Sequence, residues 1–235
     1  MKTKIFLFSF FLITILFINP LSAEEEQREV PSFSEISLRV PAQLHLEQGN
    51  KQSIRIEAKS STLEKIITEV RDRQLVIRFQ NRDLFFNSFN PGKIDIYVTV
   101  PEVDGLAISG SGDIIAQNKI STRILDLKVS GSGDINLNDL DAERVKASIS
   151  GSGDILIENG GVADDFTANI SGSGSVKAKE FKANDVSVNI AGSGSCSVAA
   201  EKSLKARIAG SGNVYYNGNP NIDSSVAGSG RVKKL

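Results

Sequence analysis

Hydrophobic and polar residues alternate in one short pattern that recurs along the second half of the chain. Each copy reads apolar, x, Gly, x, Gly, x, apolar, where x is mostly Ser, Ala or a charged residue. A period of two is typical of extended chain with one face toward a core. The two apolar columns are therefore predicted to be buried: Ile108, Val129, Ile149, Ile170, Ile190, Ile208 and Val226 in the first, and Ile114, Ile135, Ile155, Val176, Cys196, Val214 and Val232 in the second.

The glycines of this pattern belong to a four-residue phrase, Ser-Gly-Ser-Gly or Ala-Gly-Ser-Gly, at intervals of 18 to 21 residues. A fixed period near 20 is typical of repeat architectures, in which stacked copies bury an apolar face that one copy cannot bury alone. The fold class predicted is all-β: a parallel β-solenoid of about seven rungs, about 4.8 Å apart. The phrase begins at Ser109, Ser130, Ser150, Ser171, Ala191, Ala209 and Ala227.

The presence of two glycines in every copy of the phrase has two possible physical explanations. Either the chain bends there with a positive φ angle, or two walls of the solenoid approach too closely for side chains. The sequence leaves both explanations open.

The first residues have the pattern of a secretory signal peptide, predicted over 1–23. Lys2 and Lys4 precede an apolar stretch, Ile5–Ile18, and Ala23 supplies the small residue at the cleavage site. The stretch is shorter than the roughly 20 apolar residues that a membrane span needs. We therefore expect export to the periplasm or the cell surface, with no membrane span after removal of the signal.

The rest of the chain divides into three parts. Residues 24–32 are predicted to be a flexible charged lead. Residues 33–105 form a β-rich part without the repeat, which is expected to add turns to the solenoid or to cap it, with one or two helical turns within Ser61–Thr68. Residues 106–235 are the repeat rungs. The alternating runs of the second part are Ile36–Val40, Leu44–Leu46, Ile54–Ala58, Leu75–Phe79 and Ile94–Val100.

A cluster of aromatic residues stands among loop formers in Asn81–Gly92. It contains Phe85, Phe86 and Phe89. These rings could form an exposed tip that contacts a partner, or they could fold back over the end of the core. As an exposed tip they are a candidate contact surface.

Composition excludes several function classes. The formal net charge of −1 argues against a nucleic-acid partner. The single cysteine, Cys196, falls in a buried column and is expected to be a small apolar residue. The single histidine, His45, alternates with Leu44 and Leu46 and should face outward. A nucleophilic serine needs a base within reach, and with His45 as the one histidine a serine–histidine triad is not expected. No catalytic residue and no cofactor is predicted.

Three aspartates share one outward column: Asp113, Asp134 and Asp154. The plain interpretation is that Asp favours the turn and solvates this face. A second interpretation is a cation site, with these three residues as the candidate metal ligands. A third is acid–base chemistry on a polysaccharide, for which paired carboxylates about 5 Å apart are suited.

The run Ile94–Ile114 (IDIYVTVPEVDGLAISGSGDI), with SGSGDI again at Ser130 and Ser150, resembles the family described as putative auto-transporter adhesin, head GIN domain. Val40–Gly49 (VPAQLHLEQG) is similar to the opening of that family. The resemblance implies an exported protein of the bacterial envelope with a right-handed β-helical fold. The family has no established catalytic residues that could be assigned to positions of this sequence.

These observations predict a non-enzymatic, exported protein of the bacterial cell envelope that acts as a structural or binding module, with an adhesive role implied by the resemblance. An envelope protein or a glycan is the expected partner, and a homo-oligomer is a further option. The alternative is a carbohydrate-active or cation-binding β-helix that uses Asp113, Asp134 and Asp154.

Overall fold

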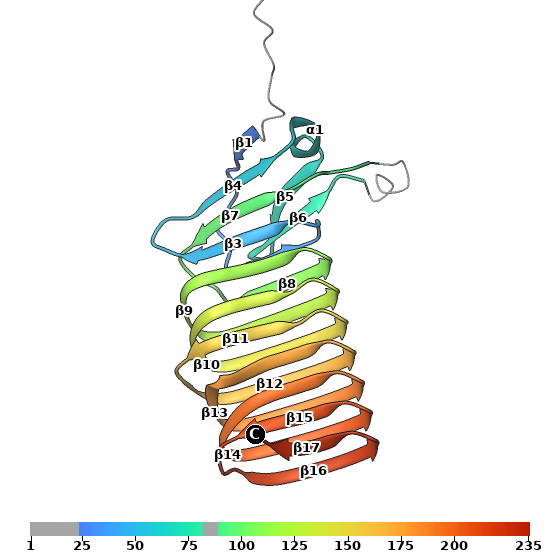
Figure 1. Ribbon diagram of the computed structural model, residues 1–235. Helices are drawn as coiled ribbons and strands as arrows, with labels where there is room; N and C mark the ends of the chain where they lie inside the picture. Colours follow the sequence, from blue (N-terminus) through green and yellow to red (C-terminus); the bar gives the residue numbers. More distant parts are fainter. Residues whose placement is uncertain (1–23, 82–88) are drawn as a thin grey trace, which may run out of the picture.

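The computed structural model describes residues 24–81 and 89–235 of the chain. They form a rod of stacked β-strand coils with an irregular β-rich part at its N-terminal end, and the C-terminus lies at the opposite end (Figure 1). The predicted signal peptide, Phe85 and Phe86 lie outside the described residues. Within those residues, no helix is long and apolar enough to cross a membrane.

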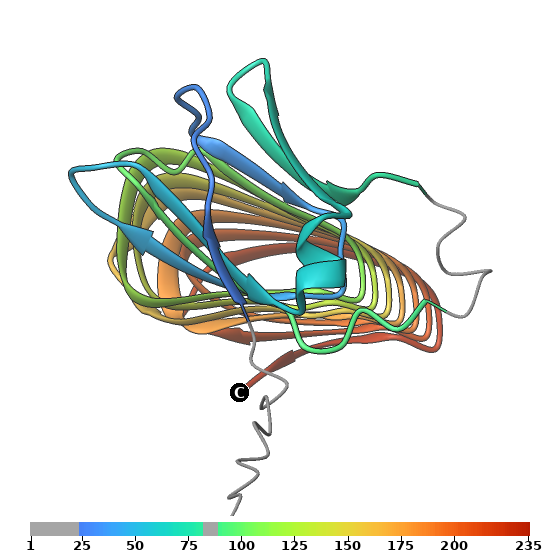
Figure 2. The ribbon, with the colours of Figure 1, turned by 90° about the horizontal axis from the view of Figure 1, so that it is seen from above.

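The described residues of the N-terminal part form seven strands and one short helix, and the last of these strands ends at Val100. Seen along the rod, the turns of the solenoid superimpose as a flattened coil, with α1 and β4 over its end (Figure 2). The elements are β1 (Glu24–Gln27), β2 (Glu35–Leu38), β3 (Gln43–Gln48), β4 (Ser53–Ala58), α1 (Ser60–Leu63), β5 (Ile66–Arg71), β6 (Gln74–Phe79) and β7 (Asp95–Val100).

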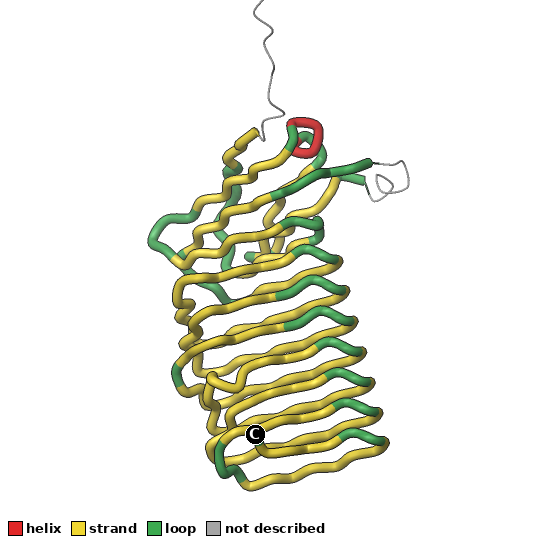
Figure 3. Tube along the Cα trace, viewed as in Figure 1, coloured by secondary structure: helices red, strands yellow, loops and turns green. Residues whose placement is uncertain are grey.

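The repeat part is a parallel β-solenoid of about six turns over residues 105–234, which confirms the predicted fold class. Long strands bend around one edge of the coil, and short loops recur at the other edge in every turn (Figure 3). The strands are β8 (Gly105–Gly110), β9 (Asp113–Gly131), β10 (Ile135–Gly151), β11 (Ile155–Gly160), β12 (Val162–Gly172), β13 (Ser175–Gly192), β14 (Ser195–Gly210), β15 (Asn213–Asn217), β16 (Asn221–Gly228) and β17 (Arg231–Lys234).

The register of the rungs stacks each apolar column on itself. Ile149 pairs with Val129 on one side and with Ile170 on the other, and each of the three side chains is at most 3% exposed. Val and Ile suit this stacking because branched side chains pack well on a pleated surface. Both predicted columns are buried, except at the last rung, where Val226 is 40% exposed and Val232 is partly buried.

The repeated phrase forms the corner of each turn, and the structure shows why both of its positions are glycine. The first glycine has a positive φ angle, as at Gly131 (+131°), where L side chains are strained. The second glycine is buried against the rung before it. At Gly153, a Cβ atom would overlap the carbonyl oxygen of Gly133 and would lie 2.8 Å from Val129 Cγ1. Gly131 is packed in the same way, since a Cβ atom there would overlap the carbonyl oxygen of Gly110. The positive φ angle therefore explains the first glycine, and the close approach of successive rungs explains both.

The N-terminal part continues the walls of the solenoid and also covers its end. β2 pairs in parallel with β6 and with β8, and β3 pairs in parallel with β7 and with β9. In contrast, β4 runs antiparallel to β7, and β5 runs antiparallel to β6. The part that was expected to add turns or to cap the solenoid does both.

Two local predictions for this part need correction. The segment predicted to be a flexible lead begins with β1, which pairs antiparallel with β4 because the backbone of an edge strand offers it free hydrogen-bonding groups. The helical turns expected within Ser61–Thr68 are limited to α1, and β5 begins already at Ile66. All six residues of β5 pair with residues of β6, so pairing with β6 decides the structure there.

Candidate functional site

The three aspartates of the outward column connect successive rungs. Asp113 Oδ1 accepts a hydrogen bond from the backbone N–H of Asp134 at 2.9 Å, and Asp134 Oδ1 accepts one from Asp154 N–H at 2.7 Å. Asp154 Oδ1 accepts a third from Ser175 N–H at 2.8 Å, while its Oδ2 accepts from Lys177 Nζ at 2.6 Å. Each carboxylate therefore satisfies a backbone donor of the next rung.

The later rungs, which lack the aspartates, satisfy the same donors differently. The amides of Ser195 and Asn213 donate to glycine carbonyls of the preceding rung at 3.2 and 3.1 Å. In the earlier rungs the carboxylates accept hydrogen bonds that are shorter than these backbone bonds. Hydrogen bonds to a charged acceptor are also stronger than those between neutral groups. No group of three or more His, Cys, Asp or Glu among the described residues is arranged to hold a metal ion. This geometry favours a structural role for Asp113, Asp134 and Asp154.

Replacing Asp134 with Ala should lower the stability of the folded chain by about 1–3 kcal/mol, because the Asp154 amide loses its acceptor. Asp134→Asn should retain most of the stability, since its side-chain oxygen can accept the same bond. Thermal melts of both variants, with Ser132→Ala as the near-silent control, would test this. A calcium-dependent rise in the melting temperature of the wild type that is absent in Asp134→Asn would instead support the cation site.

The two other reactive side chains considered from the sequence are His45, which stacks on a tyrosine ring, and Cys196, which is buried. His45 faces outward as predicted, stacked on the Tyr97 ring at 4.9 Å between centroids. Cys196 is fully buried, and this burial raises the pKa of its thiol to about 12. The structure brings neither of them to the corner serines, whose backbone amides, such as Ser132 N–H, donate to glycine carbonyls of the preceding rung.

The aromatic cluster is described only at Phe89. Its ring packs edge-on against Phe79 at 5.7 Å between centroids, and Lys65 Nζ lies 4.4 Å from its centroid. Phe89 is partly buried against the core. At this residue the ring folds back onto the core, as one of the two interpretations of the cluster expected.

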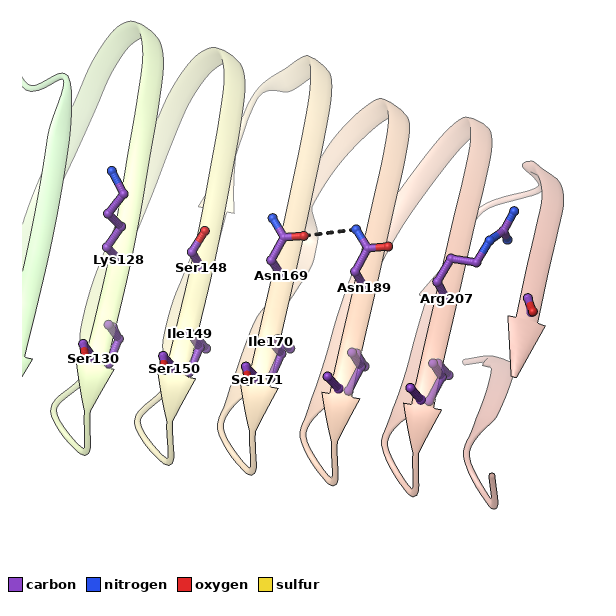
Figure 4. Close-up of a pocket in the computed structure, with 16 residues that line it drawn as sticks. Lys128, Ser130, Ser148, Ile149, Ser150, Asn169, Ile170, Ser171, Asn189 and Arg207 are labelled. Atoms are coloured by element: carbon purple, nitrogen blue, oxygen red, sulfur yellow. Dashed lines mark hydrogen bonds between the residues drawn. The ribbon is translucent and has the colours of Figure 1, made fainter. Parts of the chain in front are cut away.

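A shallow groove of about 580 Å³ runs across the rungs on the face opposite the aspartate column. We call it the groove. Figure 4 shows its two rows of side chains along the rod. The row next to the corner is Ser130, Ser150, Ser171, Ala191 and Ala209, and the row beside it is Lys128, Ser148, Asn169, Asn189, Arg207 and Ser225.

The groove has small side chains at its centre and cations toward its ends. Asn189 Nδ2 donates to Asn169 Oδ1 at 3.0 Å, which orders the central pair of amides. Arg207 is held by Asp223, whose Oδ2 accepts a hydrogen bond from its guanidinium at 2.6 Å, and Lys128 is paired with Asp126. The pairing with Arg207 lowers the pKa of the Asp223 carboxyl. No residue lining the groove is Asp, Glu, His or Cys.

Sequence reasoning missed the groove. The corner row is part of the repeated phrase, but its neighbour row varies in residue type from Lys128 to Asn169 to Arg207. The available signal was position: each of these residues lies two before the start of a phrase. It therefore shares the outward face of the strand with the residue that begins the phrase.

The comparisons with known proteins agree on the fold. A crystal structure of a putative adhesin from Bacteroides fragilis matches with a TM-score of 0.83 at 24% identity, covering 90% of this chain and 96% of that one. A putative adhesin from Parabacteroides merdae matches with a TM-score of 0.72 at 22% identity, covering 91% of this chain and 96% of that one.

A third solved structure carries a different description. It is a putative lipid binding protein from Parabacteroides distasonis, with a TM-score of 0.77 at 25% identity, covering 91% of this chain and 97% of that one. A comparison with curated proteins gave no match.

The family comparison covers most of the chain. The model of the family described as putative auto-transporter adhesin, head GIN domain, matches residues 32–220. This match includes most of the repeat rungs and nearly all of the N-terminal β-rich part. The chain therefore belongs to the putative auto-transporter adhesin, head GIN domain family.

Proposed function

We propose that this protein is a non-enzymatic binding module of the bacterial cell envelope, exported to the periplasm or the cell surface, and that it holds a linear glycan along the groove. The observation that carries the proposal is the groove itself, in which hydroxyl and amide side chains recur from rung to rung along the rod. The family's description as an adhesin and its implied export support the location.

The chemistry of the groove suits a sugar polymer. Ser hydroxyls and Asn amides both donate and accept hydrogen bonds, as sugar hydroxyls do. Neighbouring rungs are about 4.8 Å apart, which is close to the length that one sugar adds to an extended chain. The small side chains of Ser150, Ser171 and Ala191 leave room for the flat face of a sugar ring over the sheet.

The proposal of a non-enzymatic role rests on what the candidate residues do. General acid–base catalysis needs a side chain that titrates or accepts a proton beside the substrate. The groove lining has no such carboxylate, imidazole or thiol. The carboxylates of Asp113, Asp134 and Asp154 lie on the other face and accept bonds from the backbone. Binding is therefore the function that we propose for the groove.

Lipid binding is the second candidate. It is favoured by the description of the Parabacteroides distasonis protein and by the methyl groups of Ala191 and Ala209 in the corner row of the groove. An acyl chain would then lie where the first proposal places the sugars. The two candidates share one surface and differ in the probe that binds to it.

A bulky substitution in the groove tests both candidates. We expect Ser150→Trp to abolish binding because an indole would fill the corner row, whereas the chain should fold because Ser150 is exposed. The matched control is Asn136→Trp, on the opposite face. The measurement is retardation in gels that contain xylan or polygalacturonate, together with flotation on phosphatidylglycerol vesicles.

The outcomes separate the candidates. Retardation by a polysaccharide that Ser150→Trp removes and Asn136→Trp retains supports the glycan proposal. Vesicle binding with the same dependence, and no retardation, supports the lipid candidate instead. Binding that survives Ser150→Trp, or no binding to any probe, would overturn the assignment of the groove.

A further inference from the structure

The sheet that carries the groove continues into the N-terminal part. Leu38 of β2 pairs with Ile108 of β8 on one side and with Ile77 of β6 on the other. Ile108 in turn pairs with Val129 of β9, next to the groove. Outward side chains of β2 and β6 therefore stand in line with the two rows of the groove, along the same face of the rod.

Three arginines gather on this continuation. Together with neighbouring polar residues they line a pocket of about 620 Å³, which we call the arginine pocket. Arg39 lies one strand from the rung of Ser109 and two strands, roughly 10 Å, from that of Ser130. The lining is Glu35, Arg39, Glu69, Arg71, Asp72, Gln74, Val76 and Arg78.

The arginines of this pocket differ in how they are paired. Arg78 Nε donates to Glu69 Oε1 at 2.9 Å, and Arg71 donates to Glu69 Oε2 at 2.8 Å. One carboxylate therefore accepts hydrogen bonds from two guanidinium groups. These bonds lower the pKa of the Glu69 carboxyl. The Arg39 guanidinium donates through Nε to Ser37 Oγ at 3.1 Å, and it forms no ion pair with any described carboxylate.

The outward columns from β5 to β16 carry charges of both signs in similar number. They hold eight cations and six carboxylates, and Asp72 of the pocket adds a seventh carboxylate. The opposite face holds the aspartate column. The cations are Arg39, Arg71, Arg78, Lys128, Arg144, Lys146, Lys205 and Arg207, and the carboxylates of the columns are Glu35, Glu69, Asp126, Asp165, Asp185 and Asp223.

We infer that the glycan held along the groove is acidic, and that the arginine pocket binds its carboxylate groups. This inference rests on the proposed function and adds to it the class of sugar. A guanidinium presents a planar fork of donors that matches a carboxylate in two parallel hydrogen bonds. We assign the binding of the sugar carboxylate to Arg39, because its guanidinium forms no ion pair with a described carboxylate of the protein.

The test compares two forms of one polymer. Polygalacturonate carries a carboxylate on each sugar, and its fully methyl-esterified form has the same backbone without the charge. We expect the wild type to bind the acidic form about tenfold more tightly or better, as one charge-assisted hydrogen-bonded contact would give. Arg39→Gln should lose most of this preference. Arg231→Gln, an exposed arginine on the last rung and outside this face, is the matched control.

Each outcome has one meaning. Equal binding of both forms by the wild type would overturn the inference and leave the proposed glycan function standing. A preference for the acidic form that Arg39→Gln and Arg231→Gln weaken equally would overturn the role of the pocket. No binding of either form, with binding to phosphatidylglycerol vesicles, would overturn the proposed function together with the inference.

Discussion

Replacing Ile149 with Asp should leave the chain unable to fold. Ile149 is 3% exposed and stacks between Val129 and Ile170 in the first apolar column. An unpaired carboxylate there costs several kcal/mol, and a folded domain has only about 5–15 kcal/mol in total. Because each rung is stabilised by its neighbours, the loss of one rung in the middle separates the stack into two parts.

Circular dichroism and the reactivity of Cys196 measure this effect together. In the folded chain the thiol is buried and its pKa is raised to about 12, so at about pH 8 it stays neutral and shielded from a thiol reagent. We expect rapid reaction in Ile149→Asp. Ser150→Asp is the matched control, since the next residue along the strand is exposed. A soluble Ile149→Asp with wild-type melting would show that this column does not face inward.

Replacing Gly153 with Ala should have the second largest effect. The added Cβ would overlap the carbonyl oxygen of Gly133 and press on Val129 Cγ1 at 2.8 Å, and the backbone of the neighbouring rung cannot move without disturbing the stack. Overpacking typically costs about 1–3 kcal/mol, and we expect the upper end of this range here because the overlap is with backbone atoms. For a domain of this size we expect the melting temperature to fall by roughly 10 °C.

The adjacent serine provides the control for this variant. Ser152 is exposed at the same corner, and Ser152→Ala should melt within about 1–2 °C of the wild type, as surface substitutions do. A thermal melt followed by circular dichroism near the β-sheet minimum, at roughly 218 nm, gives the melting temperatures of both variants. If Gly153→Ala and Ser152→Ala melt alike, the close approach of successive corners is not what requires glycine there.

The solenoid could be predicted because its information is local and repeated. The two apolar columns around the phrase, such as Ile149 and Ile155, fix which face of each strand is buried without knowledge of any distant contact. The phrase could not reveal by itself that only its first glycine has a positive φ angle, or that both glycines are packed against the rung before. The packing depends on contacts between rungs, such as the approach of Gly153 to the carbonyl of Gly133.

The N-terminal part and the binding face could not be predicted in the same way. β2 lies between β6 and β8, so its partners come from residues about 40 and 70 positions later in the chain. This pairing places Arg39 and Arg78 in line with the groove, and no spacing in the sequence indicates it. The aspartate column was visible in the sequence, but its bonds to backbone amides depend on the stacking of the rungs.

A nuclear magnetic resonance titration of the labelled protein with short oligomers of galacturonate tests whether the groove face binds a linear glycan. We expect the chemical shifts of backbone amides to change along one face only, from Arg39 through Ser130 and Ser171 to Arg207. Changes centred on Asp113, Asp134 and Asp154, or no changes at all, would contradict this expectation.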